Sequence, residues 1–182
     1  LLYGSAPNVA FCFNPTTNTA CTGWETSIAL PDYSWRIVPL PNASGTTVAT
    51  CFLYGINATP MFSVQATTKG ARCYTSAGAP YTTNIGWLTT YLGPSQGDWF
   101  PSGISNDPEV NGTKIYWSNN ARFEKMRYFC WDVSLNAGVG GECPNFPIVS
   151  HEAVSTTNNY VNTSYTLNLD PLNSNCLWVN ND

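Results

Sequence analysis

The sequence predicts an all-β protein, an antiparallel β-sandwich or flattened barrel with long loops and at most one or two short helices. Two observations lead to this class. Short segments rich in β-branched and aromatic residues recur along the chain, and 13 Pro and 14 Gly punctuate its 182 residues. The alternating helices of an α/β sheet are missing from the pattern. We expect a single disulfide-stapled β-domain over residues 1–182.

The strands are predicted in order from apolar or alternating segments that lie between turn signals. They are residues 35–40, 48–56, 61–66, 85–92, 113–117, 128–135, 147–150, 160–169 and 176–179. The Thr-, Ser-, Gly- and Pro-rich stretches 67–83 and 93–112 are predicted to be loops. Residues 118–128 begin with capping residues and place Phe123 and Met126 at helical spacing, so a short helix is predicted there, with a strand as the alternative for its second half. No internal repeat is evident.

Seven cysteines suggest disulfides rather than a metal site. None forms a Cys-x-x-Cys pair, which a zinc site built on thiolates needs. Proximity in sequence favours the pairs Cys12–Cys21, Cys51–Cys73 and Cys130–Cys143, which leaves Cys176 over. Disulfides imply an oxidising compartment, so we expect an extracellular or surface-displayed protein. The alternative is that all seven are reduced and buried.

Charge and composition exclude several kinds of partner. Only 10% of the residues are charged and the net charge is −4, without a basic arm, so no nucleic-acid partner is expected. The apolar runs are too short to cross a bilayer, and direct membrane insertion is not expected. Because the chain begins at Leu1 rather than Met, we expect it to be part of a longer protein, through which any oligomer would form.

Four of the seven bases lie within fourteen residues that are also rich in aromatic side chains. This predicted patch consists of Lys114, Tyr116, Trp117, Arg122, Lys125 and Arg127. Such a patch suits an acidic sugar or an acidic protein surface, through charge-assisted hydrogen bonds and aromatic packing. The alternative is that the Arg and Lys stems only cover an apolar stripe.

The seven tryptophans divide into two groups by their neighbours. Four lie in apolar segments and are predicted to be core residues: Trp35, Trp87, Trp131 and Trp178. The other three lie beside polar or turn residues and are candidates for exposed contacts with a ligand: Trp24, Trp99 and Trp117. We add Trp99 to the predicted ligand-binding residues.

Catalytic and metal-binding patterns are weak. A pair of carboxylates in aromatic surroundings would suit a glycosidase, and the candidates are Asp98, Glu109, Glu124 and Asp132. His151 is the single imidazole, and nothing marks a partner for it. The segment 107–112 matches the start of a calcium loop, but the twelfth position is Ser118 rather than a carboxylate. We predict no metal and no cofactor.

Four Asn-x-Ser/Thr acceptor sites for N-glycosylation are present, at Asn42, Asn57, Asn111 and Asn162. An Asn-, Ser- and Thr-rich chain produces about this number by chance, so their placement is more informative. Asn42 and Asn111 lie in turn-like surroundings and are expected to be exposed. Asn57 precedes Pro60 and is a poorer acceptor, and Asn162 lies in a strand-like run.

Disulfides, acceptor sites, Asn/Thr/Tyr-rich strands and long loops together resemble the receptor-binding regions of viral attachment glycoproteins. The resemblance covers the general character of the whole chain and assigns no individual residue. It implies a secreted or virion-surface domain that binds a host receptor protein or glycan and is not an enzyme. Two alternatives stay open: a small secreted carbohydrate-active enzyme that uses two carboxylates, and a structural subunit of a surface filament that pairs through an edge strand.

Overall fold

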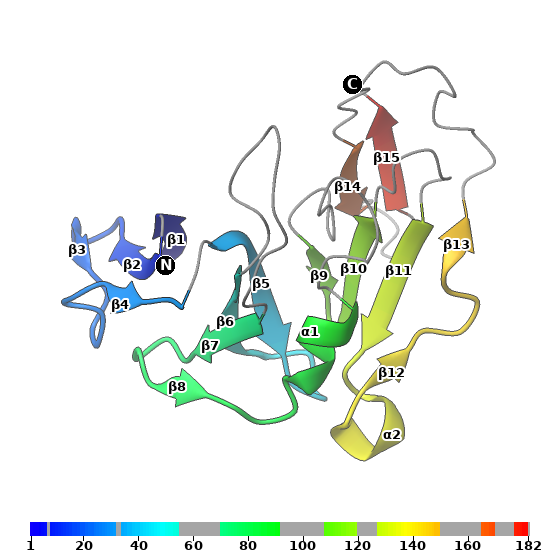
Figure 1. Ribbon diagram of the computed structural model, residues 1–182, viewed down its shortest axis with the longest axis horizontal. Coiled ribbons are helices and arrows are strands. Elements are labelled where there is room, and N and C mark those ends of the chain that lie inside the picture. Colours follow the sequence, from blue (N-terminus) through cyan, green and yellow to red (C-terminus); the bar gives the residue numbers. More distant parts are fainter. Residues whose placement is uncertain are drawn as a thin grey trace. The chain divides into compact units, whose positions relative to one another are not determined.

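The computed structural model describes residues 1–6, 8–31, 34–54, 70–91, 108–119, 127–149, 165–169 and 177–181. In these residues strands predominate, every pair of strands whose register is given is antiparallel, and the helices are two short segments (Figure 1). The all-β prediction is confirmed. The strands of the described residues pair into four sheets, which we call A to D.

The four sheets contain fifteen strands of the described residues. Sheet A contains β1 (Leu2–Ala6), β2 (Val9–Asn14), β3 (Thr19–Ala20) and β4 (Ile28–Ala29), and sheet B contains β5 (Ser34–Pro41), β6 (Thr47–Tyr54), β7 (Gly70–Tyr74) and β8 (Pro80–Tyr81). Sheet C contains β9 (Glu109–Asn111), β10 (Lys114–Asn119), β11 (Arg127–Asp132), β12 (Gly141–Glu142) and β13 (Ile148–Val149), and sheet D contains β14 (Tyr165–Leu169) and β15 (Leu177–Asn181). The helices are α1 (Gly86–Tyr91) and α2 (Leu135–Gly138).

The chain forms two compact units. Unit 1 comprises Leu1–Leu40 and Thr47–Gly93, and unit 2 comprises Pro41–Thr46 and Pro94–Asp182. Sheets A and B therefore belong to unit 1, apart from the last residue of β5, and sheets C and D belong to unit 2. The single-domain prediction for residues 1–182 stays a prediction.

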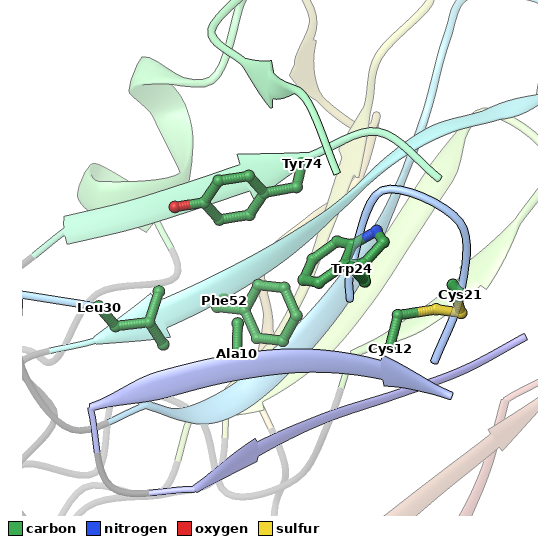
Figure 2. Packing of buried hydrophobic residues seen from close by; sticks show 7 residues of the cluster. All are labelled: Ala10, Cys12, Cys21, Trp24, Leu30, Phe52 and Tyr74. Atoms are coloured by element: carbon green, nitrogen blue, oxygen red, sulfur yellow. A yellow bond between two sulfur atoms is a disulfide. The ribbon is translucent and has the colours of Figure 1, made fainter. Parts of the chain in front are cut away.

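Unit 1 is a sandwich of sheets A and B around an aromatic core. Trp24 is 2% exposed and lies with its ring centroid 5.6 Å from that of Tyr74 and 6.2 Å from that of Phe52, two residues of sheet B. Ala10 and Cys12 of β2 contribute to the same cluster from sheet A (Figure 2). Burial of this apolar surface is the main stabilising term that holds the two sheets together.

Two turns also join the sheets of unit 1 through close backbone contact. Gly23 and Gly78 both have positive φ, 82° and 75°, and a Cβ added at Gly78 would lie 2.1 Å from the Gly23 carbonyl oxygen. Any larger residue would push the turns apart. At the same place the Trp24 indole N–H donates a hydrogen bond of 3.2 Å to the Ser76 carbonyl.

Most predicted strands are confirmed, and several other predicted segments are wrong. Strands β5, β6, β10, β11, β13, β14 and β15 overlap predicted segments. The predicted strand 85–92 is wrong, because α1 lies there, and the predicted loop 67–83 contains β7 and β8. The predicted helix 118–128 is wrong at both ends, which belong to β10 and β11, and its middle lies outside the described residues, as does the predicted strand 61–66.

The three disulfides are the pairs favoured by the cysteine spacing: Cys12–Cys21, Cys51–Cys73 and Cys130–Cys143. Each joins neighbouring strands or the residue just after one. They indicate an oxidising environment, extracellular or along the secretory route. Cys176 lies outside the described residues.

Sheets A and C contain the same module, although the sequence shows no repeat. In each, one central strand, β2 or β11, has a longer partner on one side and two short strands on the other. The central strand carries the first cysteine of a disulfide directly opposite a tyrosine. Tyr3 is the partner of Cys12, and Tyr116 is the partner of Cys130.

The second half of the module is repeated as well. The backbone N–H of the second cysteine donates to the carbonyl of the first, at 3.1 Å from Cys21 and 2.9 Å from Cys143. Three residues later an aromatic residue donates its own N–H back to that second cysteine, at 2.9 Å from Trp24 and 3.2 Å from Phe146. Each of these aromatic rings lies against the tyrosine of its module, with centroids 5.8 Å and 6.1 Å apart.

The register of the short strands also agrees. The residue after the first cysteine pairs with the residue before the second, as Phe13 with Ala20 and as Trp131 with Glu142. The residue two before the first cysteine pairs with an isoleucine in both sheets, Ile28 or Ile148. Because the modules share few side chains besides these, the repeat is visible in the pairing and not in the sequence.

Candidate functional site

The hairpin of β10 and β11 carries the residues of the predicted patch and is built as a rigid element. Ile115 is fully buried and Trp117 is 1% exposed. The Trp117 ring is stacked on that of its cross-strand partner Phe129, with centroids 5.4 Å apart and an angle of 10° between the planes. The Cys130–Cys143 disulfide ties β11 to the residue after β12. Burial, ring stacking and the disulfide therefore hold the described residues of this hairpin in place.

The bases of the predicted patch lie at two different ends of this hairpin. Lys114 pairs with Asp132 at one end of β10, whereas Arg127 pairs with Asn119 at the other. A strand rises about 3.4 Å per residue, so the two ends are about 17 Å apart. Arg122 and Lys125 lie outside the described residues, in the connection between Asn119 and Arg127. In sequence, Arg122 and Lys125 precede Arg127 directly, whereas Lys114 lies at the other end of the strand pairing.

Lys114 lies instead beside a hydrogen-bonded carboxylate. Asp132 is 8% exposed, and its Oδ1 accepts hydrogen bonds from the Ser134 backbone N–H at 2.9 Å and the Ser134 hydroxyl at 2.6 Å. Burial by itself would raise the pKa of Asp132. The hydrogen bonds from Ser134 and the Thr113 hydroxyl, together with the positive charge of Lys114, outweigh burial and lower that pKa. At this end of the hairpin, Asp132 therefore stabilises the turn that follows β11.

Two aromatic residues of the predicted patch are core residues. Tyr116 is 7% exposed and Trp117 is 1% exposed, so neither ring offers a flat face to a ligand. Burial, and then the charge of Asp132, raises the pKa of the Tyr116 hydroxyl. The expectation that Trp24 and Trp117 are exposed is wrong, because both side chains are buried. Trp99 lies outside the described residues.

The other tryptophan predictions concern the core. Trp87 and Trp131 are buried, as predicted, at 8% and 7% exposure. The side chains of Trp35 and Trp178 lie outside the part of the chain whose side chains are described.

The connection 120–126 is five residues longer than its counterpart in sheet A. In sheet A, Ala6 pairs with Val9, so two residues join β1 to β2. The equivalent pair in sheet C is Asn119 with Arg127, and seven residues join β10 to β11. The cross-strand register is the same in sheets A and C. The longer connection therefore adds residues between β10 and β11 without altering the strand pairing. Insertions on a fixed scaffold are a common place for binding residues.

Of the candidate carboxylates, only Glu109 and Asp132 are described. They lie on β9 and β11, on either side of β10, opposite Tyr116 and Lys114 respectively. Asp132 has a lowered pKa and is held by Ser134, which does not suit a general acid. Asp98, Glu124 and His151 lie outside the described residues. In the described part of the chain no three His, Cys, Asp or Glu side chains form a group that suits a metal ion.

Asn42 lies in a tight turn between β5 and β6 that orders its side chain. Its Oδ1 accepts hydrogen bonds from the Ser44 N–H at 3.0 Å, the Ser44 hydroxyl at 2.7 Å and the Thr46 N–H at 3.0 Å. This arrangement, an Asx turn, holds the carboxamide through its oxygen. Asn111 ends β9 and is partly exposed, while Asn57 and Asn162 lie outside the described residues.

The outer face of sheet A is a surface that the sequence reasoning missed. Alternation along β2 places Ala10 and Cys12 inward and Val9, Phe11 and Phe13 outward, so both faces of this strand are apolar. Phe11 is 41% exposed, and Leu2 of β1 is 58% exposed. A run that is apolar in both phases, as in residues 9–13, was the available signal.

The fold and these sites define a disulfide-stapled all-β protein with a repeated sheet module and a seven-residue connection between β10 and β11. No family model, curated protein or solved structure matches the chain. Among the described residues no helix is long and apolar enough to span a membrane.

Proposed function

We propose that this protein is an extracellular binding domain that recognises a receptor protein or glycan on a cell surface. The observation that carries the proposal is the insertion between Asn119 and Arg127, because it adds Arg122 and Lys125 to one end of a rigid hairpin. Three of the seven bases of an otherwise acidic chain gather there in sequence. The ligand chemistry that this charge favours is a carboxylate or sulfate, on an acidic sugar or on an acidic protein surface.

The general character of the chain supports the same function. The disulfides suit an oxidising extracellular environment, and the resemblance to viral attachment glycoproteins extends the proposal to a virion surface and a host receptor. N-glycans at Asn42 and Asn111 are part of the proposal, because both acceptor sites are in turns or at a strand end. Loops carried on a rigid β-scaffold are a common location for binding residues.

Charge reversal at the hairpin end tests the proposal. The variant Arg122→Glu/Arg127→Glu is compared with the unaltered chain for attachment to cultured cells and to an array of acidic glycans. A charge-assisted hydrogen bond contributes about 1.5–3 kcal/mol, so loss of one such bond weakens binding about tenfold or more. Attachment of the unaltered chain is also expected to weaken as the salt concentration rises.

Arg72→Glu is the matched control. Arg72 is exposed on β7 of unit 1 and is not part of the hairpin, and its substitution makes the same change of charge per residue. It is expected to leave attachment unchanged. Attachment that is equal in the double variant and the control would refute the role of the hairpin end. Removal of acidic sugars from the cells separates a glycan ligand from a protein ligand.

A further inference from the structure

The outer edge of β1 is open in the part of the chain that the structure describes. β1 is the end strand of sheet A and pairs with β2 alone, whereas β10, which takes its place in the module of sheet C, lies between β11 and β9. Leu2 of β1 is 58% exposed, and Ile115, at the same register position of β10, is fully buried. Among the described strands, sheet A therefore lacks one strand that sheet C has.

The backbone of β1 directs hydrogen-bonding groups to this open edge. The Cys12 carbonyl accepts a hydrogen bond from the Cys21 N–H, so the backbone polar groups of Cys12 point away from β1. In an antiparallel ladder the N–H and C=O of one residue point to the same side, and the residue opposite a strand position that is turned away is turned away too. Tyr3 is the partner of Cys12, and Ser5 follows two residues later. Both residues therefore present their N–H and C=O at the outer edge.

Sheet C shows what occupies this edge when the module is complete. Tyr116 corresponds to Tyr3, because each lies opposite the first cysteine of its module. The strand on the other side of Tyr116 is β9, which runs antiparallel to β10. The register of β9 on β10 is Glu109 with Tyr116, Val110 with Ile115, and Asn111 with Lys114. Transferred to β1, this register places an apolar residue opposite Leu2 and polar residues opposite Leu1 and Tyr3.

β1 also lacks the features that protect sheet edges from pairing. Proteins block edge strands with charged residues, with prolines or by keeping the strand very short. Each other edge strand described in sheets A, B and C has one of these features. β5 contains Arg36 and two prolines, β9 contains Glu109, and β3, β4, β8, β12 and β13 have two residues each. β1 has five residues, Leu-Tyr-Gly-Ser-Ala, without a charge or a proline, so its edge is open to strand addition.

We propose that the outer edge of β1 binds an extended segment of a partner protein by strand addition. The segment runs antiparallel to β1 and exchanges backbone hydrogen bonds with Tyr3 and Ser5, as β9 pairs with β10 in sheet C. It carries an apolar side chain opposite Leu2 and polar side chains on either side, which is the pattern Glu-Val-Asn of β9. The backbone hydrogen bonds supply affinity and the alternating side chains supply specificity. β1 belongs to unit 1, so the inference does not depend on the proposed role of the hairpin of β10 and β11.

An NMR titration with a synthetic peptide tests the proposal. The probe is a capped copy of residues 107–111, Asp-Pro-Glu-Val-Asn, added at millimolar concentration to the isotope-labelled, disulfide-bonded chain. Its proline falls opposite Gly4, where the nitrogen of a bound strand points away from β1. The amide signals of Tyr3 and Ser5 are expected to shift with peptide concentration. Their hydrogen exchange is expected to slow about tenfold when the peptide concentration is about ten times the dissociation constant.

Peptides that are N-methylated at one residue supply the matched control. A methyl group on the glutamate nitrogen removes the N–H that faces Tyr3 and is expected to weaken binding about tenfold or more. A methyl group on the valine nitrogen, opposite Leu2, replaces an N–H that points away from β1 and is expected to leave binding unchanged. Replacing the valine of the peptide with aspartate is expected to weaken binding, because a charge would lie against Leu2.

Three results would overturn the proposal. The first is that the signals of Tyr3 and Ser5 do not move when the peptide is added. The second is that both N-methylated peptides bind equally, which would indicate side-chain contact without strand pairing. The third is that these signals shift with protein concentration alone, which would assign the edge to a second copy of this chain. The Arg122→Glu/Arg127→Glu variant is expected to bind the peptide normally, so failure of this proposal and failure of the proposed function are observed separately.

Discussion

Replacing Trp24 with Ala is expected to lower the free energy of unfolding by about 4 kcal/mol. The Trp24 ring is 2% exposed and lies within 6.2 Å, centroid to centroid, of Tyr3, Phe52 and Tyr74. An aromatic side chain of this size buries about 200 Å², and at about 25 cal/mol per Å² its transfer contributes about 5 kcal/mol. The alanine left in place keeps a small part of this, and measured Trp→Ala losses in cores are about 3–5 kcal/mol.

Two further variants separate the contributions. Trp24→Phe keeps most of the apolar contact but loses the hydrogen bond to the Ser76 carbonyl, so a loss of about 1–2 kcal/mol is expected. Phe146 occupies the equivalent place in unit 2 but is only half-buried and has a single ring contact among those described, with Tyr116. Phe146→Ala is therefore expected to cost about 2 kcal/mol, less than Trp24→Ala.

Urea unfolding followed by far-UV circular dichroism measures all three differences. The loss of unfolding free energy is expected to be largest for Trp24→Ala and smaller for Phe146→Ala, and the loss for Trp24→Phe is expected to equal or fall below that of Phe146→Ala. A loss below about 1 kcal/mol for Trp24→Ala would refute the view that this ring joins sheets A and B, because a cavity of that size in a core costs more.

Three other predictions concern the disulfides, acid stability and glycosylation. Replacing both cysteines of Cys51–Cys73, which are 22 residues apart, is expected to cost about 3.4 kcal/mol, against about 2.6 kcal/mol for the pair Cys12–Cys21 at a separation of 9, as measured by urea unfolding. The lowered pKa of Asp132 means that its stabilising contribution is complete above about pH 3.9 and is lost as the pH falls through the folded pKa, so Asp132→Asn is expected to flatten the acid limb of a stability-against-pH curve. In a eukaryotic secretory host Asn42 is expected to carry a glycan that Ser44→Ala removes, as read by peptide mass spectrometry; an unmodified Asn42 would contradict this.

The disulfides and strands such as β6 and β11 could be predicted because their signals are local. The three pairs are the nearest cysteines in sequence, and β6 and β11 are rich in aromatic and β-branched residues. The segment around Trp87 and Leu88 could not be assigned in this way, because a short apolar run suits a buried helix as well as a strand. β2 was missed for a related reason: both of its faces are apolar, so it lacks the alternation that marks a half-buried strand.

The binding residues were predicted less well than the fold. Lys114 and Arg127 were grouped because they are close in sequence. They lie at opposite ends of the hairpin, because the residues of an extended strand are spread along its length. Polar neighbours suggested that Trp117 is exposed, yet the neighbours of a strand residue point to the other face of the sheet. The repeat was invisible because pairing register, and not side-chain identity, is what the two modules share.

The unequal connections in the two modules indicate where this scaffold tolerates foreign sequence. Ala6 and Val9 are joined by two residues, and their counterparts Asn119 and Arg127 by seven, while every cross-strand partner behind them stays in place. Loop length at this position is thus uncoupled from strand pairing. A peptide epitope or affinity tag grafted between Ala6 and Val9 should be displayed without disturbing sheet A, which makes the first module a candidate carrier for engineered ligands.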